Sequence, residues 1–264
     1  MNRRGFTLVE LLVAVGITGL VLGIVASATR TQGRSAVFQM GTADMQQNVR
    51  GALQLFKSEL RMAGYGMSSV PADVLAPVEV PDSADQYQIV LRGNYQNIAS
   101  RGSALAGTST ITLDPTMAPF PMFVPGERVA IESALLAVAE VRVIAAYNPA
   151  TGTISVDEAL DNDYGIRSPV NQIDELTYRL DDQDILWRSG TLVADQLDAL
   201  ALEYVLADGT VLMNPAGNLD TLRSATIRMH AELEERHGLK PQAELETEVR
   251  IRNLGIAREP GVGT

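Results

Sequence analysis

The hydrophobic and polar positions of the chain divide it into three parts. Residues 6–29 form an almost uninterrupted apolar run, in which Glu10 is the only ionisable side chain. From residue 34 to residue 63, apolar residues recur mostly at steps of three and four, which predicts one stripe along an amphipathic helix. From residue 86 onward, short runs rich in β-branched residues are bounded by Gly, Pro or Asn, which is typical of strands joined by turns. The pattern predicts a long N-terminal helix followed by a β-rich region.

The two helical parts are expected to join into one helix from Phe6 to about Ala63. No proline precedes Pro71, and Gly64 is suited to the left-handed residue that ends a helix. Glycines at 33, 41 and 51 each cost roughly 1 kcal/mol relative to alanine, which favours bends at these points. The apolar stripe comprises Val37, Met40, Met45, Val49, Ala52, Leu53, Phe56, Leu60 and Ala63, while Gln46, Gln47, Arg50, Lys57 and Glu59 are expected on the other faces.

The β-rich region is predicted to form an antiparallel sheet against the helix, with extra strands in a second β subregion. Residues 67–85 are expected to be a loop and residues 114–126 an exposed loop or strand edge, because both are rich in turn-forming residues. Residues 259–264 are expected to be a loose tail. A helical turn is an alternative for Asp195–Leu202. The predicted strands are Gln86–Arg92, Thr108–Leu113, Arg128–Glu132, Ala139–Ala145, Thr153–Val156, Leu176–Leu180, Ile185–Arg188, Ala199–Leu206, Ala225–Leu233 and Glu246–Arg252.

The apolar run is long enough to cross a membrane. Its 24 residues from Phe6 to Thr29 would span roughly 36 Å as a helix, which exceeds the hydrocarbon core of a bilayer. A carboxylate inside such a segment costs several kcal/mol, so Glu10 requires a partner. If the chain is cut after Gly5, the new amine of Phe6 lies one helical turn from Glu10.

This N-terminus resembles the type IV prepilin signature. The basic leader Met1–Gly5 is followed by Phe6-Thr7-Leu8-Val9-Glu10, which matches the signature completely. The resemblance implies that prepilin peptidase cuts between Gly5 and Phe6 and methylates the new amine of Phe6. It also implies that Glu10 pairs with the N-terminus of a neighbouring subunit during filament assembly.

A second stretch resembles the minor pilins of the PilW type. Residues 45–66, above all Arg61-Met-Ala-Gly-Tyr65, are similar to that group, and Glu248–Leu254 resembles its last strand. The resemblance implies a type IV pilin-like α+β fold and a non-enzymatic minor pilin that initiates or caps a pilus. The implied partners are prepilin peptidase, other minor pilins, the major pilin and the assembly platform of the inner membrane. The related pseudopilin J of type II secretion, or a tip adhesin that binds a ligand, is an alternative.

The resemblance and the hydrophobic pattern together imply five segments. Residues 1–5 are the leader, 6–30 the transmembrane and filament-core helix, and 31–64 the amphipathic helix. Residues 65–258 form the globular domain, which is expected in the periplasm, and 259–264 the tail. Charges flank the apolar run almost equally, so the expected orientation depends on the resemblance.

Two other interpretations of the N-terminus are open. Ala26-Ser27-Ala28 fits the cleavage site of an ordinary secretory signal, and an uncleaved anchor is the other alternative. The length of the run and the presence of Glu10 favour the prepilin interpretation over both. Gly19 and Gly23 form a G-x-x-x-G spacing that allows close helix packing in lipid, although glycine is common in membrane helices generally.

Composition excludes several classes of protein. The 264 residues carry a net charge of −11, which disfavours nucleic acid as a partner, and contain no cysteine for a disulfide, thiolate metal site or nucleophile. Neither phosphate-binding motif, G-x-x-x-x-G-K-S/T or G-x-G-x-x-G, is present, and no cofactor is expected.

Candidates for catalysis and metal binding are weak. Ser224, His230 and Asp220 are the nearest approach to a nucleophilic triad, but six strand residues separate Ser224 from His230 by about 20 Å. His230 and His237 lack the spacing of a zinc site. Asp181, Asp182 and Asp184, and the acidic segment 157–163, concentrate oxygen ligands suited to calcium, but neither follows the EF-hand order, and solvated turns are the simpler interpretation.

Overall fold

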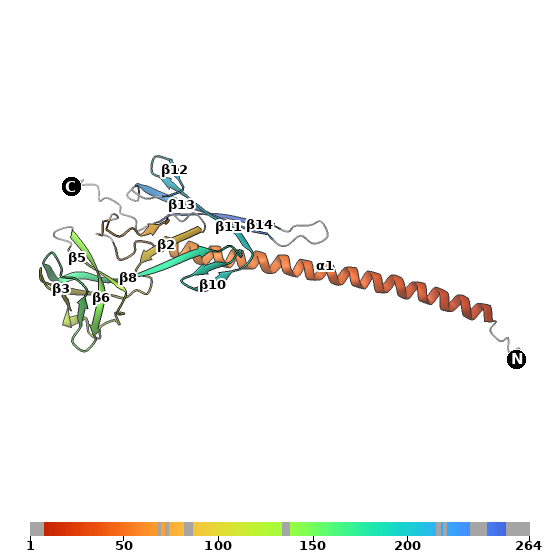
Figure 1. The fold of residues 1–264 in the computed structure, drawn as a ribbon, viewed down its shortest axis with the longest axis horizontal. Helices are drawn as coiled ribbons and strands as arrows, with labels where there is room; N and C mark the ends of the chain where they lie inside the picture. Colours follow the sequence, from red (N-terminus) through yellow and green to blue (C-terminus); the bar gives the residue numbers. More distant parts are fainter. Residues whose placement is uncertain are drawn as a thin grey trace. The chain divides into compact units, whose positions relative to one another are not determined.

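The computed structural model describes residues 8–67, 70–71, 74–81, 87–133, 138–214, 218, 221–232 and 242–251, without the Arg34 side chain. The chain divides into two compact units, Met1–Gln47 and Asn48–Thr264. The described part of the first unit is helical throughout, and the second combines the end of the same helix with antiparallel sheets (Figure 1). The predicted α+β pilin-like architecture is confirmed.

Helix α1 runs from Leu8 to Met62 without interruption. Its predicted start at Phe6 lies outside the described residues, and its predicted end differs by one residue. Gly64 has a φ of +78°, the left-handed conformation expected of a helix terminator. Its backbone N–H donates to the carbonyl of Arg92 at 2.8 Å, so the chain leaves the helix against strand β2 (Tyr87–Gly93).

The apolar stripe of α1 is buried only from residue 45 onward. Met45, Val49, Ala52, Phe56, Leu60 and Ala63 are buried, whereas Val37 and Met40 are exposed. One assignment to the other faces was wrong, because Glu59 lies on the buried side, at 8% exposure. Polar partners from two strands compensate for its burial, and such compensation cannot be seen in the spacing of apolar residues.

The described strands are listed here with their bounds. They are β1 (Val78–Glu79), β2 (Tyr87–Gly93), β3 (Ala99–Ala104), β4 (Thr110–Leu113), β5 (Arg128–Ser133), β6 (Val138–Asn148), β7 (Thr153–Val156), β8 (Tyr164–Leu180), β9 (Leu186–Arg188), β10 (Thr191–Ala194), β11 (Leu197–Leu206), β12 (Val211–Leu212), β13 (Leu222–Glu232) and β14 (Gln242–Val249). A short 3-10 helix, η1 (Pro115–Met117), lies in the predicted loop 114–126.

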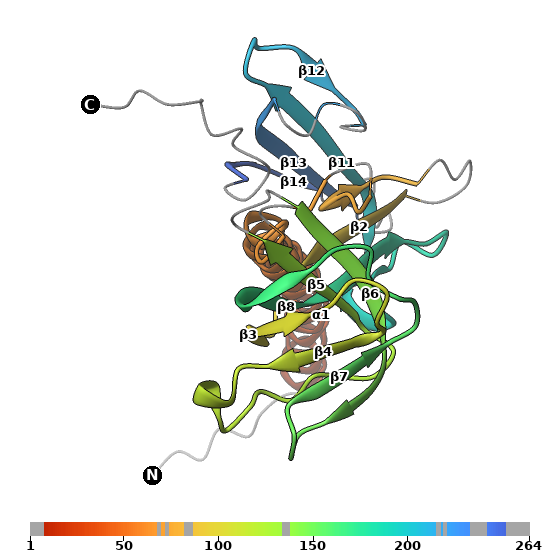
Figure 2. The same cartoon turned by 90° about the vertical axis from the view of Figure 1, so that its left-hand side faces the viewer.

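Strand β8 organises the larger sheet because its two halves pair with different neighbours. The first half pairs with β3 on one side and β5 on the other, and the second half pairs with β2 and β9. The order β8-β3-β4-β7-β6-β5 returns to β8, so these six strands close a barrel, which Figure 2 shows as strands curving around one another. The barrel is the predicted additional β subregion. Its interior is filled by buried apolar side chains, including Ile111, Leu113, Phe123, Ile131, Ile144 and Ile154.

A second sheet has the order β12-β11-β13-β14, entirely antiparallel. The helical turn considered for Asp195–Leu202 is not present, because residues 197–206 form β11. Alternating burial along β11 and the full pairing with β13 account for the strand. Strand β14 begins four residues before its predicted start, and its predicted end at Arg252 lies outside the described residues.

Several strands were missed by the pattern of β-branched residues. Strand β3 has the sequence ASRGSA, and β8 begins twelve residues before the predicted Leu176, in a stretch that contains Gly165 and Pro169. Gly102 in β3 lies so close to β4 that an added Cβ would be 2.8 Å from the Thr112 carbonyl oxygen. Barrel closure therefore selects small residues and tolerates turn formers that local propensity counts against a strand.

The C-terminal part of α1 packs on the larger sheet through close, specific contacts. The rings of Phe56 and Tyr178 meet edge to face, with centroids 4.6 Å apart. At Gly93, an added Cβ would lie 2.9 Å from the carbonyl oxygen of Met62. Glycine at this position allows the end of β2 to meet the end of the helix.

Candidate functional site: the exposed apolar segment of helix α1

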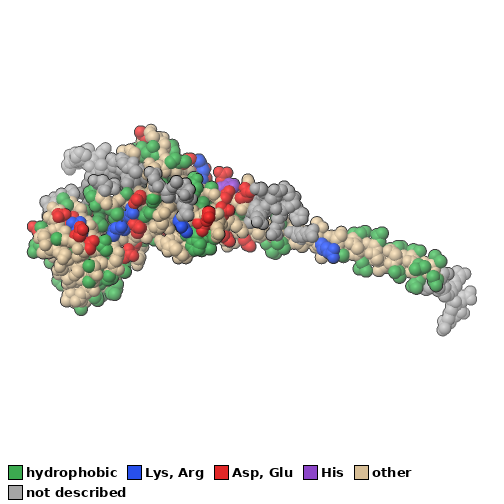
Figure 3. Space-filling model, in the orientation of Figure 1, with side chains coloured by type: hydrophobic (Ala, Val, Ile, Leu, Met, Phe, Trp, Pro, Cys, Tyr) green, Lys and Arg blue, Asp and Glu red, His purple; other side chains and the backbone are tan. Residues whose placement is uncertain are grey.

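The N-terminal part of α1, from Leu8 to Val25, exposes apolar side chains on all its faces. The large hydrophobic side chains between Leu8 and Val25 are at least 50% exposed, and Figure 3 shows hydrophobic side chains over this part of the helix. Among the described residues, α1 is the one helix that contains a segment long and apolar enough to cross a membrane. Such a surface requires lipid or other apolar partners, because its exposure to water is unfavourable.

Two threonine hydroxyls within this segment find their hydrogen-bond partners in the helix itself. The hydroxyl of Thr18 donates to the carbonyl of Ala14 at 2.8 Å, and that of Thr29 to the carbonyl of Val25 at 2.9 Å. These bonds leave neither hydroxyl dependent on water as a partner. The segment is therefore suited to a hydrocarbon environment, where unsatisfied polar groups cost several kcal/mol.

Glu10 lies in the first turn of α1, with an exposed side chain. A negative charge is favourable near a helix N-terminus, where the first backbone N–H groups have no partner within the helix. The predicted cleavage and methylation positions, Gly5 and Phe6, lie outside the described residues. The pairing of Glu10 with a neighbouring amine therefore stays a prediction.

Gly16, Gly19 and Gly23 face open space. A Cβ added at any of the three would have nothing within 4 Å. No contact within the described part of this chain requires glycine at these positions, which leaves them available for close contact with another helix. Packing through Gly19 and Gly23 stays a prediction.

The catalytic candidates are engaged in separate contacts. The Ser224 hydroxyl donates to Glu248 Oε1 at 2.7 Å, whereas His230 Nδ1 lies 2.6 Å from Asp198 Oδ1. Both residues are on β13 and six positions apart, so the structure does not bring them together as a nucleophile and its base. Asp220 and His237 lie outside the described residues.

Asp181, a calcium candidate, organises the turn between β8 and β9. Its Oδ1 accepts the backbone N–H groups of Gln183 and Ile185, both at 3.0 Å, and its Oδ2 accepts the indole N–H of Trp187 at 2.6 Å. The Trp187 bond, with the two backbone bonds, lowers the pKa of Asp181. Within the described ranges, no three His, Asp or Glu side chains are grouped so that they could hold a metal ion. Calcium binding by Asp181, Asp182 and Asp184 therefore gains no support beyond their composition.

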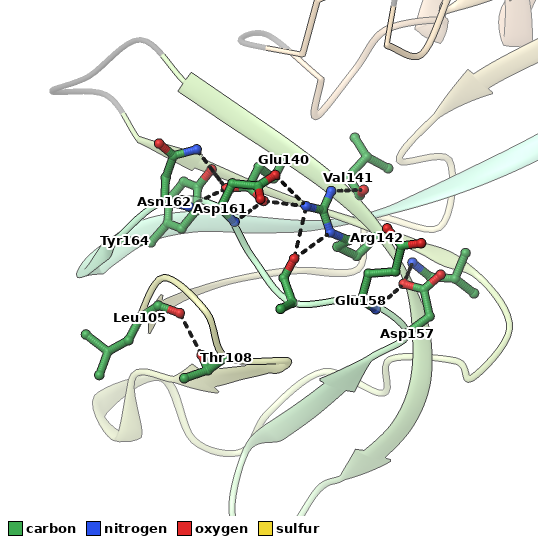
Figure 4. Close-up of polar contacts among 12 residues, drawn as sticks. Leu105, Thr108, Glu140, Val141, Arg142, Asp157, Glu158, Asp161, Asn162 and Tyr164 are labelled. Carbon is green, nitrogen blue, oxygen red and sulfur yellow. Dashed lines mark hydrogen bonds and ion pairs between the residues drawn. The ribbon is translucent and has the colours of Figure 1, made fainter.

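The buried carboxylate of Glu140 holds Asp161 and Asn162 of the acidic segment 157–163 (Figure 4). Its Oε1 accepts the backbone and side-chain N–H groups of Asn162, both at 2.9 Å, and the Tyr164 hydroxyl at 3.0 Å. Its Oε2 accepts the Asp161 backbone N–H at 2.9 Å and Arg142 Nη2 at 2.8 Å. Burial alone would raise the pKa of Glu140, but the hydrogen bonds from Asp161, Asn162 and Tyr164 outweigh it and lower the pKa. These contacts stabilise the end of the barrel.

Glu59 makes a buried polar contact that the sequence analysis missed. Its carboxylate contacts Tyr178 of β8 and Arg188 of β9, which are more than 110 positions away in the chain. A carboxylate one residue before an apolar stripe position is common on exposed helix faces, so the sequence held no signal for this contact. Only the packing of α1 on the sheet shows it.

Comparison with known proteins identifies one family feature. Residues 1–26 match the prokaryotic N-terminal methylation motif. No curated protein matches the chain. The motif and the exposed apolar helix support a type IV pilin-like protein, a pilus or pseudopilus subunit whose N-terminal helix is suited to a single-pass inner-membrane anchor. The motif also implies processing by prepilin peptidase and assembly with other pilins.

Proposed function

We propose that the protein is a minor pilin of the PilW type, a non-enzymatic subunit that initiates or caps a type IV pilus. The observation that carries this proposal is the methylation motif at residues 1–26, continuous with the exposed apolar part of α1. Residues 1–5 are the leader, 6–30 the membrane and filament-core segment, and 31–64 the connecting amphipathic helix. Residues 65–258 form the globular domain, placed in the periplasm, and 259–264 the tail.

The mechanism is electrostatic. Before assembly, the apolar helix holds the subunit in the inner membrane. Cleavage after Gly5 creates a cationic amine on Phe6, which is then methylated. Glu10 of an incoming subunit pairs with the amine of another subunit inside an apolar helix bundle, and a misaligned Glu10 remains unpaired at a cost of several kcal/mol. The pair therefore sets the register between subunits.

The barrel favours a position at the tip. Strands β3 to β7 and the first half of β8 add a closed domain to the sheet that α1 packs on. Bulk of this kind is accommodated most easily where no further subunit follows. The same features suit pseudopilin J of a type II secretion system, and capture of the partner proteins distinguishes the two.

The N-terminus of the mature chain is the first test. Mass spectrometry of the protein purified from membranes is expected to show a chain that begins with methylated Phe6. A chain that begins at Thr29, after an ordinary signal cleavage, or at Met1 would contradict the proposal.

The second test concerns assembly. Glu10→Ala is expected to leave cleavage largely intact and to reduce incorporation into filaments at least tenfold. Glu158→Ala, which removes an exposed carboxylate outside the helix, serves as the matched control and should assemble normally. Normal incorporation of Glu10→Ala would refute the electrostatic mechanism.

A further inference from the structure

A carboxylate from α1 contacts side chains from two neighbouring strands of the larger sheet. Glu59 Oε2 accepts the hydroxyl of Tyr178 at 2.5 Å. Its Oε1 lies 2.6 Å from Arg188 Nη2 and 2.8 Å from Arg188 Nε. Charge-assisted hydrogen bonds of this kind are stronger than neutral ones, and the double contact with arginine adds a defined geometry.

Burial and neighbouring groups keep Arg188 charged and Tyr178 protonated, which are the forms that donate to the Glu59 carboxylate. The hydrogen bond to Glu59 raises the pKa of Arg188. Burial, followed by the hydrogen bond and the charge of Glu59, raises the pKa of Tyr178. The guanidinium therefore stays charged and the phenol stays a donor. Tyr95 adds a bond from its hydroxyl to the backbone carbonyl of Glu59 at 3.1 Å, which satisfies one of the free carbonyls at the helix end.

The sheets do not need the helix for their own hydrogen bonds. Tyr178 and Arg188 are directly paired in the β8–β9 ladder, and β8 continues into a barrel with its own core. Residues 48–62 are part of α1 and take no part in a strand ladder. Their separation from the sheet would break no ladder, but it would expose the buried stripe that includes Val49, Phe56 and Leu60, so such a local opening costs free energy and stays rare.

Other polar contacts between this part of α1 and the strands are more accessible to water. Asn48 Nδ2 donates to Asp195 Oδ1 at 2.9 Å in an exposed contact, and Lys57 Nζ to Thr247 Oγ1 at 2.9 Å in a partly buried one. Exposed contacts contribute little because water replaces them readily. The contact of Glu59 with Tyr178 and Arg188 is buried in contrast, and these bonds break together if the helix leaves the sheet.

We propose that Glu59, Tyr178 and Arg188 form a latch that sets how often residues 48–62 of α1 leave the sheet while the barrel stays folded. This conformational role is separate from the proposed pilus function and holds for the isolated chain.

The test uses the absence of native cysteine. A single cysteine replaces either Ala52 on α1 or Ala104 on β3 in the barrel core, which are 1% and 6% exposed, in the full chain in detergent micelles. The rate of reaction with a maleimide reports opening at each place. Glu59→Gln removes the charge, and we expect it to raise the rate at position 52 at least tenfold while the rate at position 104 changes less than twofold.

Glu246→Gln is the matched control, because Glu246 pairs with Arg228 at 2.8 Å on the exposed face of the second sheet. It should change neither rate more than twofold. An unchanged rate at position 52 in Glu59→Gln would overturn the latch. So would equal acceleration at both positions, including complete unfolding, because Glu59 would then contribute only to global stability.

Discussion

Replacing Glu140 offers the most direct test of how the barrel end is held together. The carboxylate accepts five hydrogen bonds, three through Oε1 and two through Oε2. Glu140→Ala leaves the Asp161 and Asn162 amides and the Arg142 guanidinium without this partner. Removing one member of a buried charged pair costs about 3–5 kcal/mol, and we expect a loss of this size in the free energy of unfolding.

Glu140→Gln removes the charge of the side chain but keeps its shape. In its better orientation, the amide oxygen still serves the three Oε1 donors, whereas the amide nitrogen faces the Asp161 N–H and Arg142, which are also donors. Two donors left unpaired cost about 1–3 kcal/mol each when fully buried, and partial hydration reduces the sum, so we expect a loss of about 2 kcal/mol. Glutamine should therefore lie between alanine and the natural chain.

Urea unfolding of the full chain in micelles, followed by far-UV circular dichroism, measures these free energies. Hydrogen exchange at the Asp161 and Asn162 amides shows whether the loss begins in the segment 157–163. Glu158→Gln, an exposed acid of the same segment, should change stability by less than about 0.5 kcal/mol. Equal stability of Glu140→Ala and the natural chain would refute the assigned role of the carboxylate.

Three further predictions follow from the described contacts. Gly93→Ala should cost about 1–3 kcal/mol, because its Cβ would lie 2.9 Å from the Met62 carbonyl oxygen, whereas Gly165→Ala, which meets nothing within 4 Å, should be nearly neutral in the same urea assay; equal effects would contradict the close approach. Tyr204→Phe should leave the melting temperature unchanged or raise it, because the buried Tyr204 hydroxyl has no hydrogen-bond partner among the described residues; a clear fall would show that the hydroxyl has a favourable contact. Hydrogen bonds lower the pKa values of Glu140 and Glu175 despite burial. As the pH falls below the usual value of 4.5, the unfolded chain therefore takes up protons before the folded chain does. The stability that these carboxylates contribute above that pH is then lost. Glu140→Gln should show a shallower loss between pH 5 and about pH 3 in thermal melts, and an equally steep loss would exclude this contribution.

The prediction of α1 depended largely on residues that are neighbours in the chain, and the structure confirms the helix and its buried stripe from Val49 onward. A helix repeats every 3.6 residues, so its buried face can be read from residues that are neighbours in the chain. The stripe from Val49 to Leu60 and the terminating role of Gly64 were therefore correct. The methylation motif is also local, since a protease reads a short continuous segment. The strands in which β-branched residues dominate, such as β4 and β7, were found for the same reason.

Local patterns in the sequence were sufficient to predict the long helix, the apolar segment with its single carboxylate and the β-rich character of the remaining chain. The packing of the folded chain was needed to show that the two halves of β8 pair with different strands, that six strands close a barrel and that Glu59 is buried. Strand pairing and the compensation of a buried charge depend on residues far apart in the chain, as in the contact of Glu59 with Tyr178. These contacts stabilise the chain only once it has folded, so local propensity does not predict them.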